Sequence, residues 1–477
     1  MVQNSLIKNA FYNIIYRILN VVFPLISSGY IARVILPAGV GQVSYAQNIV
    51  SYFTVFAALG IPIYGVRVIS QSRDDKEQLN RRFSELIILN GISTTICLLL
   101  YLLLLILLFK ENISLYLICG ILIIFNYINI DWFYQGIEDY AYIAIRSSII
   151  KTISMICLFI FVKTPADICK YALITVLAAG GNYIFNIIHA VGYVSIRLKN
   201  LDLARHLKPI LFLMASFLAS ELYTKVDVTM LGYTGVNEAV GYYTNSLNIV
   251  NMLITLPTAV TAIFLPRISY YYKTNRKKYE KLINKGVEIL FFLILPCFVG
   301  IELVSDYAIP VLFGQAFLPA AKTLRLLAPL ILIKGFGDLL CYQVVISSDN
   351  ERMLWLPYTL TALINMMLNV ILIPRYLQDG AAIATVISEL LLNLILYCFV
   401  TKKVIRIQID LRENIKIIVA AMLMVCMVIL VQRLHLNMLF SLILQILSGG
   451  FIYLICNLII GSRICTVFIK YFLKIEK

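Results

Sequence analysis

The segment Glu221–Arg267 decides the fold; it opens with ELYTKVDVTMLGY and continues, after a short turn, with GYYTNSLNIV at Gly241–Val250. The second block is similar to GQVSYAQNIV at Gly41–Val50, because Gly, Asn, Ile and Val recur 200 positions apart. Each block follows an apolar stretch and a short loop, and each opens another apolar stretch. We therefore interpret the chain as two copies of one unit that meet just before Glu221.

The composition identifies the class of protein. Of the 477 residues, 61% are hydrophobic and only 14% are charged, which is far outside the range of soluble domains. The apolar stretches are long enough for helices of about 20 residues, and they lack the alternation of β-barrel strands. The N-terminal residues are polar and no cleavage site of small residues follows them, so we expect no removable signal peptide. The chain is predicted to be an all-α integral membrane protein.

Fourteen membrane spans are predicted from the apolar stretches. They cover residues 10–33, 43–66, 84–109, 113–134, 141–162, 168–194, 209–232, 239–265, 284–304, 322–346, 353–373, 380–401, 415–432 and 437–460. One side of the membrane receives 28 lysines and arginines and the opposite side receives eight, which places both termini in the cytoplasm. This asymmetry explains the net charge of +15 without nucleic acid as a partner, and anionic lipid headgroups are the expected neighbours.

The spacing of the two copies predicts the domains. The related blocks lie six spans apart, so both halves enter the membrane in the same direction, as in two-lobed secondary transporters with parallel repeats. We expect an N-terminal six-helix lobe at residues 1–200 and a C-terminal six-helix lobe at 201–410. Two extra transmembrane helices and a cytoplasmic tail are expected at 411–477.

Basic residues lie within predicted spans, where an ionisable group is by default functional or paired; they include Arg17, Lys151, Lys225 and Lys334. Lys225 follows Glu221 by one helical turn, so the two can pair, whereas Asp227 points elsewhere. Lys334 and Asp338 repeat this spacing, and an internal salt bridge is the favoured interpretation.

A polar stripe marks the first span. Asn9, Asn13, Arg17 and Asn20 recur at helical spacing on one face. In one interpretation the stripe lines a water-filled cavity and Arg17 meets an anion; in the other it is a packing face and Arg17 snorkels. Four polar residues are many for a packing face, so we favour the cavity. Lys151 in the fifth span has no evident partner and is expected to face that cavity.

Two further polar stripes lie in the eleventh and twelfth spans. They comprise Thr361, Asn365 and Asn369, and Thr385, Glu389 and Asn393. Hydroxyl, amide and carboxylate oxygens suit a hard monovalent or divalent cation, or a proton at Glu389. Hydrogen bonding between helices, worth about 0.6 kcal/mol each in membranes, explains these residues equally well.

The chain lacks the motifs of common catalytic sites, including HExxH, GxSxG, Walker A and the dinucleotide fingerprint. No loop outside the predicted spans is long enough to fold as a catalytic domain or an ATPase. We therefore expect a transporter driven by an ion gradient, the membrane potential or the gradient of its substrate. No cofactor or structural metal is expected, because most of the ten cysteines lie in apolar spans and the three histidines are scattered.

Several short motifs, in their order and spacing, resemble those of the polysaccharide repeat-unit flippases (Wzx type) of the multidrug/oligosaccharidyl-lipid/polysaccharide exporter superfamily. The resemblance covers most of the first twelve predicted spans. The motifs are A-R-x-x-x-P-A-G-V-G at 32–41, D-W-F-Y-Q-G-I-E at 131–138, V-D-x-x-M-L-G at 226–232, G-Y-Y at 241–243, L-P-R at 265–267, L-F-G at 312–314 and G-A-A-I-A-T at 380–385, followed by Glu389.

The resemblance implies a twelve-helix, two-lobed, V-shaped core whose cationic central cavity opens alternately to the cytoplasm and the exterior. It implies a substrate of undecaprenyl diphosphate that carries a short oligosaccharide. Membrane lipids, the polysaccharide polymerase and the chain-length machinery are the implied partners. The expected diphosphate-binding residues are basic; they are Arg17, Arg33, Lys225 and Lys334. The expected cavity-lining residues are Asn13, Asn20 and Lys151.

The resemblance also implies a candidate ion site. In some relatives sodium binds between spans seven, eleven and twelve, and the matching residues here are Asp227, Asn365, Asn369 and Thr385. A position that is often a carboxylate is Asn369 in this chain, so Asp227 is the one charged member of the set. Coupling to sodium, to a proton with Glu389 as carrier, or to the membrane potential alone stays open.

The leading hypothesis is a non-enzymatic flippase of the bacterial cytoplasmic membrane that moves lipid-linked oligosaccharide outward for capsule, O-antigen or exopolysaccharide assembly. A multidrug exporter of the same superfamily would need a carboxylate-lined cavity, whereas basic residues here at least match the acidic ones. A lipid II exporter would differ mainly in cargo. An integral-membrane polysaccharide polymerase would need clustered acid, base and arginine residues outside the membrane, and the longest exterior segment lacks them.

Overall fold

The structure is a computed structural model of the chain. It describes the backbone of residues 2–108, 112–199, 201–262, 264–348, 350–408, 410–434 and 436–465. Side chains are described for the same residues except 2–22, 215–220, 222, 256, 259, 262, 266 and 351.

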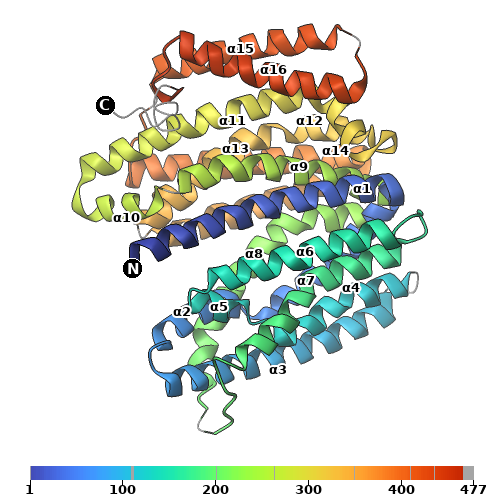
Figure 1. Cartoon of the computed structure of the whole chain (residues 1–477), viewed down its shortest axis with the longest axis vertical. Coiled ribbons are helices and arrows are strands. Elements are labelled where there is room, and N and C mark those ends of the chain that lie inside the picture. Colours follow the sequence, from blue (N-terminus) through green and yellow to red (C-terminus); the bar gives the residue numbers. More distant parts are fainter. Residues whose placement is uncertain are drawn as a thin grey trace. The chain divides into compact units, whose positions relative to one another are not determined.

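Helices make up the regular structure of the described ranges, which confirms the predicted all-α class (Figure 1). The first eight are α1 (Val2–Ala58), α2 (Ile61–Ser72), α3 (Lys76–Leu108), α4 (Ile113–Phe125), α5 (Asp131–Gly136), α6 (Tyr140–Phe161), α7 (Ile168–Ala190) and α8 (Ala204–Tyr233). The others are α9 (Asn237–Ala262), α10 (Leu265–Thr274), α11 (Arg276–Phe313), α12 (Ala320–Leu327), α13 (Pro329–Asp338), α14 (Trp355–Lys403), α15 (Leu411–Gln432) and α16 (Met438–Ile459). A π-helical turn, Leu339–Val345, follows α13.

The chain forms two compact units, Met1–Gly241 and Tyr242–Lys477. Helices α1 to α8 belong to the first unit, and α10 to α16 belong to the second. Helix α9 begins in the first unit and continues into the second. The predicted boundary between the lobes, at residue 200, separates the two copies of the internal repeat. The division into compact units does not test this repeat, so the boundary stays a prediction.

Nine helical segments of the described residues are long and apolar enough to cross a membrane. Two of these segments, Phe23–Ser72 and Trp355–Lys403, each overlap two of the predicted spans. The multi-pass membrane architecture is thus confirmed, while the count of fourteen spans stays a prediction. Helix α8 is not among the nine segments; it carries the charged residues Glu221, Lys225 and Asp227.

Two long helices break where the sequence predicted the end of one span and the start of the next. In α1 the break is at Leu36, with φ 65° and ψ 169°, directly before Pro37. In α14 it is at Leu377, with φ 48° and ψ −126°, three residues after Pro374. A leucine with positive φ is rare because its Cβ crowds the backbone, so each break marks a change of chain direction.

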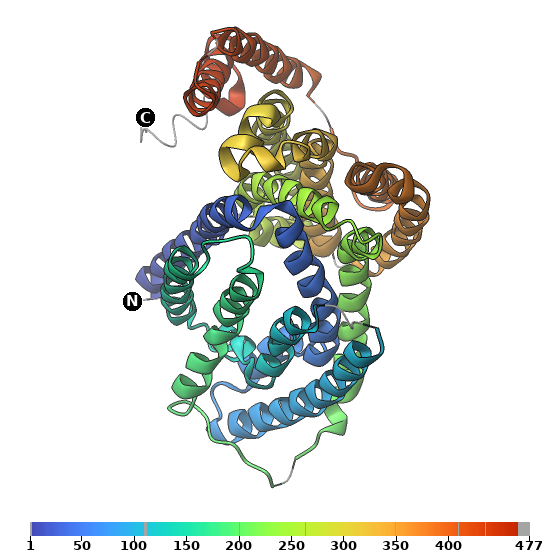
Figure 2. The same ribbon diagram turned by 90° about the vertical axis from the view of Figure 1, so that its right-hand side faces the viewer.

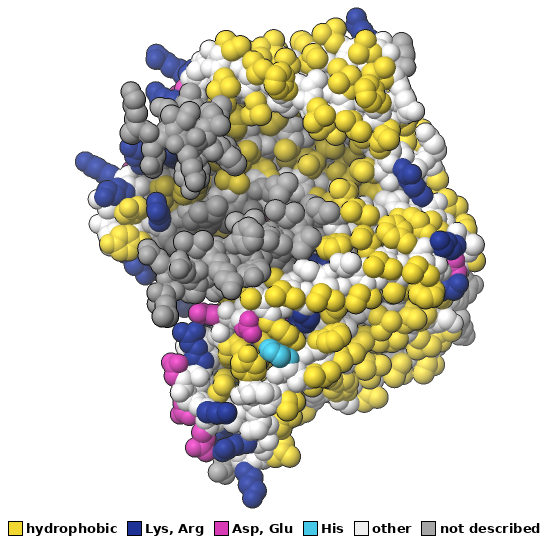
Figure 3. Space-filling model, viewed as in Figure 1, with side chains coloured by type: hydrophobic (Ala, Val, Ile, Leu, Met, Phe, Trp, Pro, Cys, Tyr) yellow, Lys and Arg dark blue, Asp and Glu magenta, His cyan; other side chains and the backbone are white. Residues whose placement is uncertain are grey.

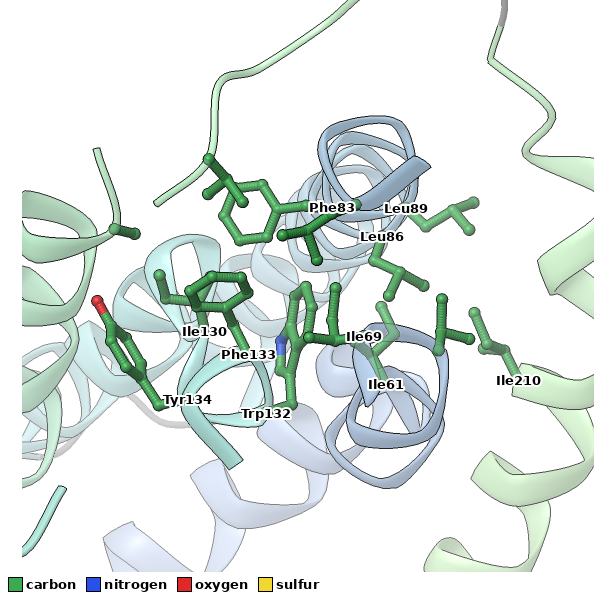
Figure 4. Close-up of a cluster of buried hydrophobic side chains, with 14 residues drawn as sticks. Ile61, Ile69, Phe83, Leu86, Leu89, Ile130, Trp132, Phe133, Tyr134 and Ile210 are labelled. Atoms are coloured by element: carbon green, nitrogen blue, oxygen red, sulfur yellow. The ribbon is translucent and has the colours of Figure 1, made fainter. Parts of the chain in front are cut away.

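A buried hydrophobic cluster holds α2, α3, α5 and α8 of the first unit together (Figure 4). Ile61, Phe83 and Trp132 come from three of these helices and are at most 3% exposed. Figure 4 shows Trp132 and Phe133 of the short α5 pointing toward α2 and α3. Removal of this much apolar surface from water fixes α5 in place, and α5 begins at Asp131.

The outer faces of the helices are apolar as well. On α3, Leu99, Leu103 and Ile106 are 53–69% exposed, whereas Tyr101 and Leu105 of the inner face are 1% exposed. Figure 3 shows hydrophobic side chains over the sides of the helices and charged side chains gathered near the helix ends. Exposed apolar surface of this extent is stable in lipid and not in water.

The two helices after the predicted twelve-helix core form a pair in the second unit. Helices α15 and α16 lie side by side and pack against α11 (Figures 1 and 2). The Tyr453 hydroxyl donates to the Phe292 carbonyl at 2.7 Å, and Gln432 donates to the Leu303 carbonyl at 3.0 Å. Because these bonds connect α15 and α16 to α11, the pair is an integral part of its unit.

The repeated sequence blocks meet at their first residues. A Cβ atom on Gly41 would lie 1.8 Å from the carbonyl oxygen of Asn237, and one on Gly241 would lie 2.3 Å from that of Pro37. Only glycine permits such a close approach of two backbones. The recurrence of glycine in the repeat therefore has a packing reason.

Gly41→Ala is expected to destabilise the protein, because the new methyl group would overlap a backbone oxygen that no rotamer change can move away. Overpacking of this kind costs about 1–3 kcal/mol. We expect the melting temperature of the purified protein in detergent to fall by several degrees. Gly450→Ala on α16 is the control, because a Cβ atom there meets nothing within 4 Å. Equal melting temperatures for the two variants would contradict the close packing.

Candidate functional site

A cavity of about 460 Å³ lies inside the first unit, between α1, α6, α7 and the start of α5. Its volume is within the range of small-molecule binding sites. Nine of the lining residues are polar or charged: Ser27, Asp131, Arg146, Ser147, Lys151, Ser154, Thr175, Asn182 and Tyr183. Such a lining inside apolar helices is costly unless the groups are hydrogen-bonded or bind a ligand.

An ion pair forms one wall of this cavity. Arg146 of α6, only 7% exposed, donates through Nη2 to Asp131 Oδ1 at 3.1 Å and through Nε to Asn182 Oδ1 at 3.1 Å. Asn186 donates to the same carboxylate oxygen at 2.6 Å. Asp131 belongs to α5, Arg146 to α6, and Asn182 and Asn186 to α7, so these bonds connect the three helices. The charge of Arg146 is balanced within the wall.

The sequence of α5 explains the position of Asp131. Trp132 and Phe133, the next two residues, are buried in the cluster of Figure 4. Tyr134 is also buried, and its hydroxyl donates to the carbonyl of Asn186 at 2.7 Å. The D-W-F-Y motif therefore combines an anchor of three aromatic residues with a carboxylate that faces the cavity. Asp131 was part of a motif in the sequence, but its role in this wall was not predicted.

Lys151 lines this cavity together with Ser147 and Thr175. Gln47 of α1 donates to the Thr175 hydroxyl at 3.0 Å and thereby links α1 to α7. Because the cavity lies within one unit, it differs from the predicted central cavity between two lobes, which stays a prediction. The predicted residues Asn13, Arg17 and Asn20 lie outside the described side chains.

A polar seam joins α1 to α8 near the predicted cations of α8. Asn48 donates to the carbonyl of Lys225 at 3.2 Å and to the Thr229 hydroxyl at 2.7 Å. Tyr52 also contacts that hydroxyl, at 2.8 Å. Lys225 is half-buried, and in the described part of the chain it forms no ion pair with Glu221, so the suggested pairing of these two is wrong.

Two other predicted residues of the first unit differ in burial. Asp227 on α8 is 3% exposed. Arg33 on α1 is exposed and lies three residues before the break at Leu36. Arg33 and Asp227 therefore occupy different environments.

Lys334 of the second unit forms an ion pair that the sequence did not predict. Its ammonium lies 3.3 Å from Glu389 Oε1, and the two side chains are 25% and 8% exposed. The i,i+4 spacing of Lys334 and Asp338 suggested Asp338 as the partner of Lys334. The observed ion pair with Glu389 instead connects α13 to α14. Asp338 is near both charges and interacts with them electrostatically. Lys334 and Glu389, which were assigned to different roles, thus form one pair.

The remaining predicted ion ligands are buried in the second unit. Asn369 donates to Asn365 Oδ1 at 3.1 Å, and both residues are at most 1% exposed. The Thr385 hydroxyl bonds to that of Tyr243 at 2.9 Å and donates to its own helix. These bonds fit the interhelical interpretation, and they leave the ion site a prediction. Asp227, the charged member of the set, belongs to the first unit.

Sequence reasoning missed the central role of Arg146. Its position near the start of the predicted span 141–162 placed it among the cytoplasmic lysines and arginines, whereas the structure buries it in α6. The sequence did contain an indication of a polar partner for Arg146. In the predicted sixth span, Asn182 and Asn186 are four residues apart and so share a helix face. Ser147 gave no signal, because single serines are common in membrane helices.

Comparisons with known proteins agree with this architecture. The family described as "Polysaccharide biosynthesis protein" matches residues 6–272. The chain is 24% identical over 404 residues to a protein of Escherichia coli (strain K12) named "Putative O-antigen transporter", covering 83% of this chain and 97% of that one.

Two solved structures share the fold. The lipid II flippase MurJ in an inward closed conformation superposes with a TM-score of 0.78 at 17% identity, covering 95% of this chain and 98% of that one. An inward-facing multidrug resistance transporter of the MATE family in the MOP superfamily superposes with a TM-score of 0.64 at 16% identity, covering 80% and 93%. At these identities the likeness concerns the fold alone.

Asp131→Asn and Arg146→Gln are each expected to destabilise the protein, because the first leaves the buried Arg146 without its counter-charge and the second leaves the Asp131 carboxylate, which is 35% exposed, without its partner. The double variant removes both charges and should be less destabilised than the sum of the two, with a coupling of about 1–3 kcal/mol. Denaturation of the four proteins in detergent measures this coupling. Lys170→Gln is the control, because Lys170 pairs with Asp167 at 2.7 Å but is 61% exposed. Strictly additive effects would contradict a direct interaction between the two side chains.

Proposed function

This chain belongs to the polysaccharide biosynthesis protein family, and from that premise we propose that it translocates undecaprenyl-diphosphate-linked oligosaccharide repeat units from the inner to the outer leaflet of the bacterial cytoplasmic membrane. The resemblance to repeat-unit flippases is confirmed by the family match and by the O-antigen transporter relatives. The relatives are named as transporters and flippases rather than enzymes.

The polar cavity inside the first unit carries the proposal. It combines about 460 Å³ of space with hydroxyl, amide and charged groups, within helices whose outer faces are apolar. A lipid-linked oligosaccharide has the same two properties, because its sugars are polar and its isoprenoid chain is apolar. The sugars then travel along polar side chains while the chain stays in lipid. Movement of a polar group across hydrocarbon without such a path would cost many kcal/mol.

We propose basic residues as the binding site for the diphosphate. Arg17, Arg33 and Lys225 are the proposed direct contacts, because charged donors bind phosphate oxygens strongly. Lys334 can join this binding site only when its ion pair with Glu389, at 3.3 Å, is broken. Protonation of Glu389, or a cation bound to it, would release the ammonium of Lys334 for the diphosphate. This exchange couples Glu389, a predicted proton carrier, to substrate binding.

Sodium coupling is a second proposal for the energy source. The proposed ligands are Asp227, Asn365, Asn369 and Thr385, which supply one carboxylate and three neutral oxygens of the kind that hard cations prefer. The proposed orientation has both termini in the cytoplasm, because the predicted loops on that side carry most of the basic residues. A polymerase and chain-length proteins on the outer side are the proposed consumers of the product, as capsule, O-antigen or exopolysaccharide.

A liposome assay tests the proposed function. The full chain is reconstituted with lipid-linked oligosaccharide extracted from its host, and a glycosidase is added outside. We expect the lipid of the inner leaflet to become accessible in the presence of the protein and to stay protected in empty liposomes. Equal protection in both would reject the flippase. Transport of lipid II at the same rate would instead identify a lipid II exporter, and transport of a fluorescent organic cation would identify a multidrug exporter.

Lys225→Ala should lower the initial rate in this assay at least tenfold, because a lost hydrogen bond to a charged group costs about 1.5–3 kcal/mol. Lys225→Arg keeps the charge and should retain most of the rate. Lys281→Ala is the matched control, since Lys281 is an exposed lysine of the basic segment of α11. The amount of each variant in the liposomes is measured by immunoblot. A normal rate for Lys225→Ala would remove this residue from the diphosphate site.

Glu389→Gln tests the proposed exchange between Lys334 and Glu389. A neutral amide holds the ammonium less strongly, so the variant should bind undecaprenyl diphosphate more tightly than the wild type, and its binding should vary less with pH. Glu280→Gln is the control, because Glu280 forms an exposed pair with Arg276 at 3.2 Å. Wild-type affinity and wild-type pH dependence in Glu389→Gln would reject the exchange.

A further inference from the structure

We propose that the cavity of the first unit recognises the sugars of the cargo rather than its diphosphate, and that Ser147 is a specificity-determining residue of this subsite. The inference rests on the proposed function and assigns a substrate part to one cavity. It is argued from the charge balance of the wall, from the hydrogen-bonding capacity of its hydroxyls and from the position of Ser147.

The charge of the wall does not match a diphosphate. Arg146 is neutralised by Asp131 at 3.1 Å, and Asn182 occupies a further donor of the guanidinium. Among the described lining residues, the remaining net charge is that of one lysine, Lys151. A diphosphate diester carries about two negative charges, and a buried charge without a counter-charge is strongly unfavourable. A neutral ligand with many hydroxyl groups does not have this mismatch.

The hydroxyls of the wall are arranged as acceptors. Ser27, Ser154 and Thr175 each donate their proton to a carbonyl oxygen of their own helix, at 2.8–2.9 Å. A serine or threonine hydroxyl has one proton and two lone pairs, so these oxygens keep only acceptor capacity. Each sugar hydroxyl brings a proton of its own to donate. The wall thus has the acceptors that a carbohydrate needs, and the ammonium of Lys151 supplies donors.

Besides Arg146 Nη1, which is buried without a hydrogen-bond partner in the described part of the chain, Ser147 is a polar group of the wall that keeps capacity for a ligand. It is 5% exposed and lines the cavity. Within the described residues its hydroxyl has no protein hydrogen-bond partner, whereas the adjacent Ser148 donates to the Ala144 carbonyl at 2.7 Å. A ligand hydroxyl at this position would satisfy both its donor and its acceptor capacity.

The rest of the lining fits the shape of a sugar. Tyr183 offers an aromatic face, and Met155 and Leu158 offer apolar surface, against which the C–H faces of a sugar ring pack. The small side chains of Ala178 and Ala179 also line the cavity and leave room in it. A larger side chain at Ala178 would therefore reduce the space for a sugar without removing any hydrogen-bonding group.

Binding measurements on the full chain in lipid nanodiscs test this subsite. Two probes are compared: undecaprenyl diphosphate without sugar, and the same lipid carrying the oligosaccharide of the host. We expect the wild type to bind the sugar-bearing lipid at least tenfold more tightly. Ser147→Ala should reduce this advantage threefold to tenfold, as expected for roughly one hydrogen bond, and leave the affinity for the bare lipid unchanged. Ser148→Ala is the matched control and should change neither affinity.

A second variant tests the subsite by its space, without changing the proposed hydrogen bond of Ser147. Ala178→Leu should remove most of the advantage of the sugar-bearing lipid and again spare the bare lipid. Wild-type behaviour of both variants, or an equal loss of affinity for both lipids, would overturn the sugar subsite. If the wild type binds both lipids equally, the subsite is rejected and the proposed function stands. If it binds neither lipid, the proposed function fails and the subsite fails with it.

Discussion

A charged side chain inside the membrane must be neutralised close to its own position, and this constraint explains the polar interior of the protein. The apolar surroundings offer no water to screen a charge, so a partner has to come from another helix. Arg146 of α6 obtains its partner from the start of α5, and Lys334 of α13 obtains its partner from α14. Each pair therefore connects elements as well as satisfying charges.

The two pairs have different consequences for transport. The Arg146 pair is supported by Asn182 and Asn186, so it forms a fixed wall of the cavity in the first unit. The Lys334 pair has a second carboxylate nearby, Asp338, and in the proposed mechanism it exchanges its partner when a proton or a cation binds. A fixed, nearly neutral wall suits sugars, and an exchangeable pair suits a charged group that must be bound and released. The two parts of a lipid-linked oligosaccharide thus have separate places in the proposed mechanism.

The membrane class and the repeat could be predicted because each follows from local sequence. Long apolar stretches predict helices, and the breaks at Leu36 and Leu377 occur where neighbouring spans were expected to end. The paired glycines at positions 41 and 241 were recognised as a repeat before their contact was known. Lys151 and Glu389 were recognised as intramembrane charges by the same local reasoning. The residues that contact these charges from other helices were not predicted, since helical spacing predicts contacts only within one helix.

By itself, the sequence determined the helical membrane class, the family and the places where charges enter the apolar stretches, and it predicted the internal repeat. Only the tertiary structure decided which groups meet: Asp131 with Arg146, Lys334 with Glu389 rather than Asp338, and Ser147 with a cavity instead of a carbonyl. The physical reason is that hydrophobicity and helical period act along the chain, whereas neutralisation of a buried charge depends on the packing of helices that are distant in sequence.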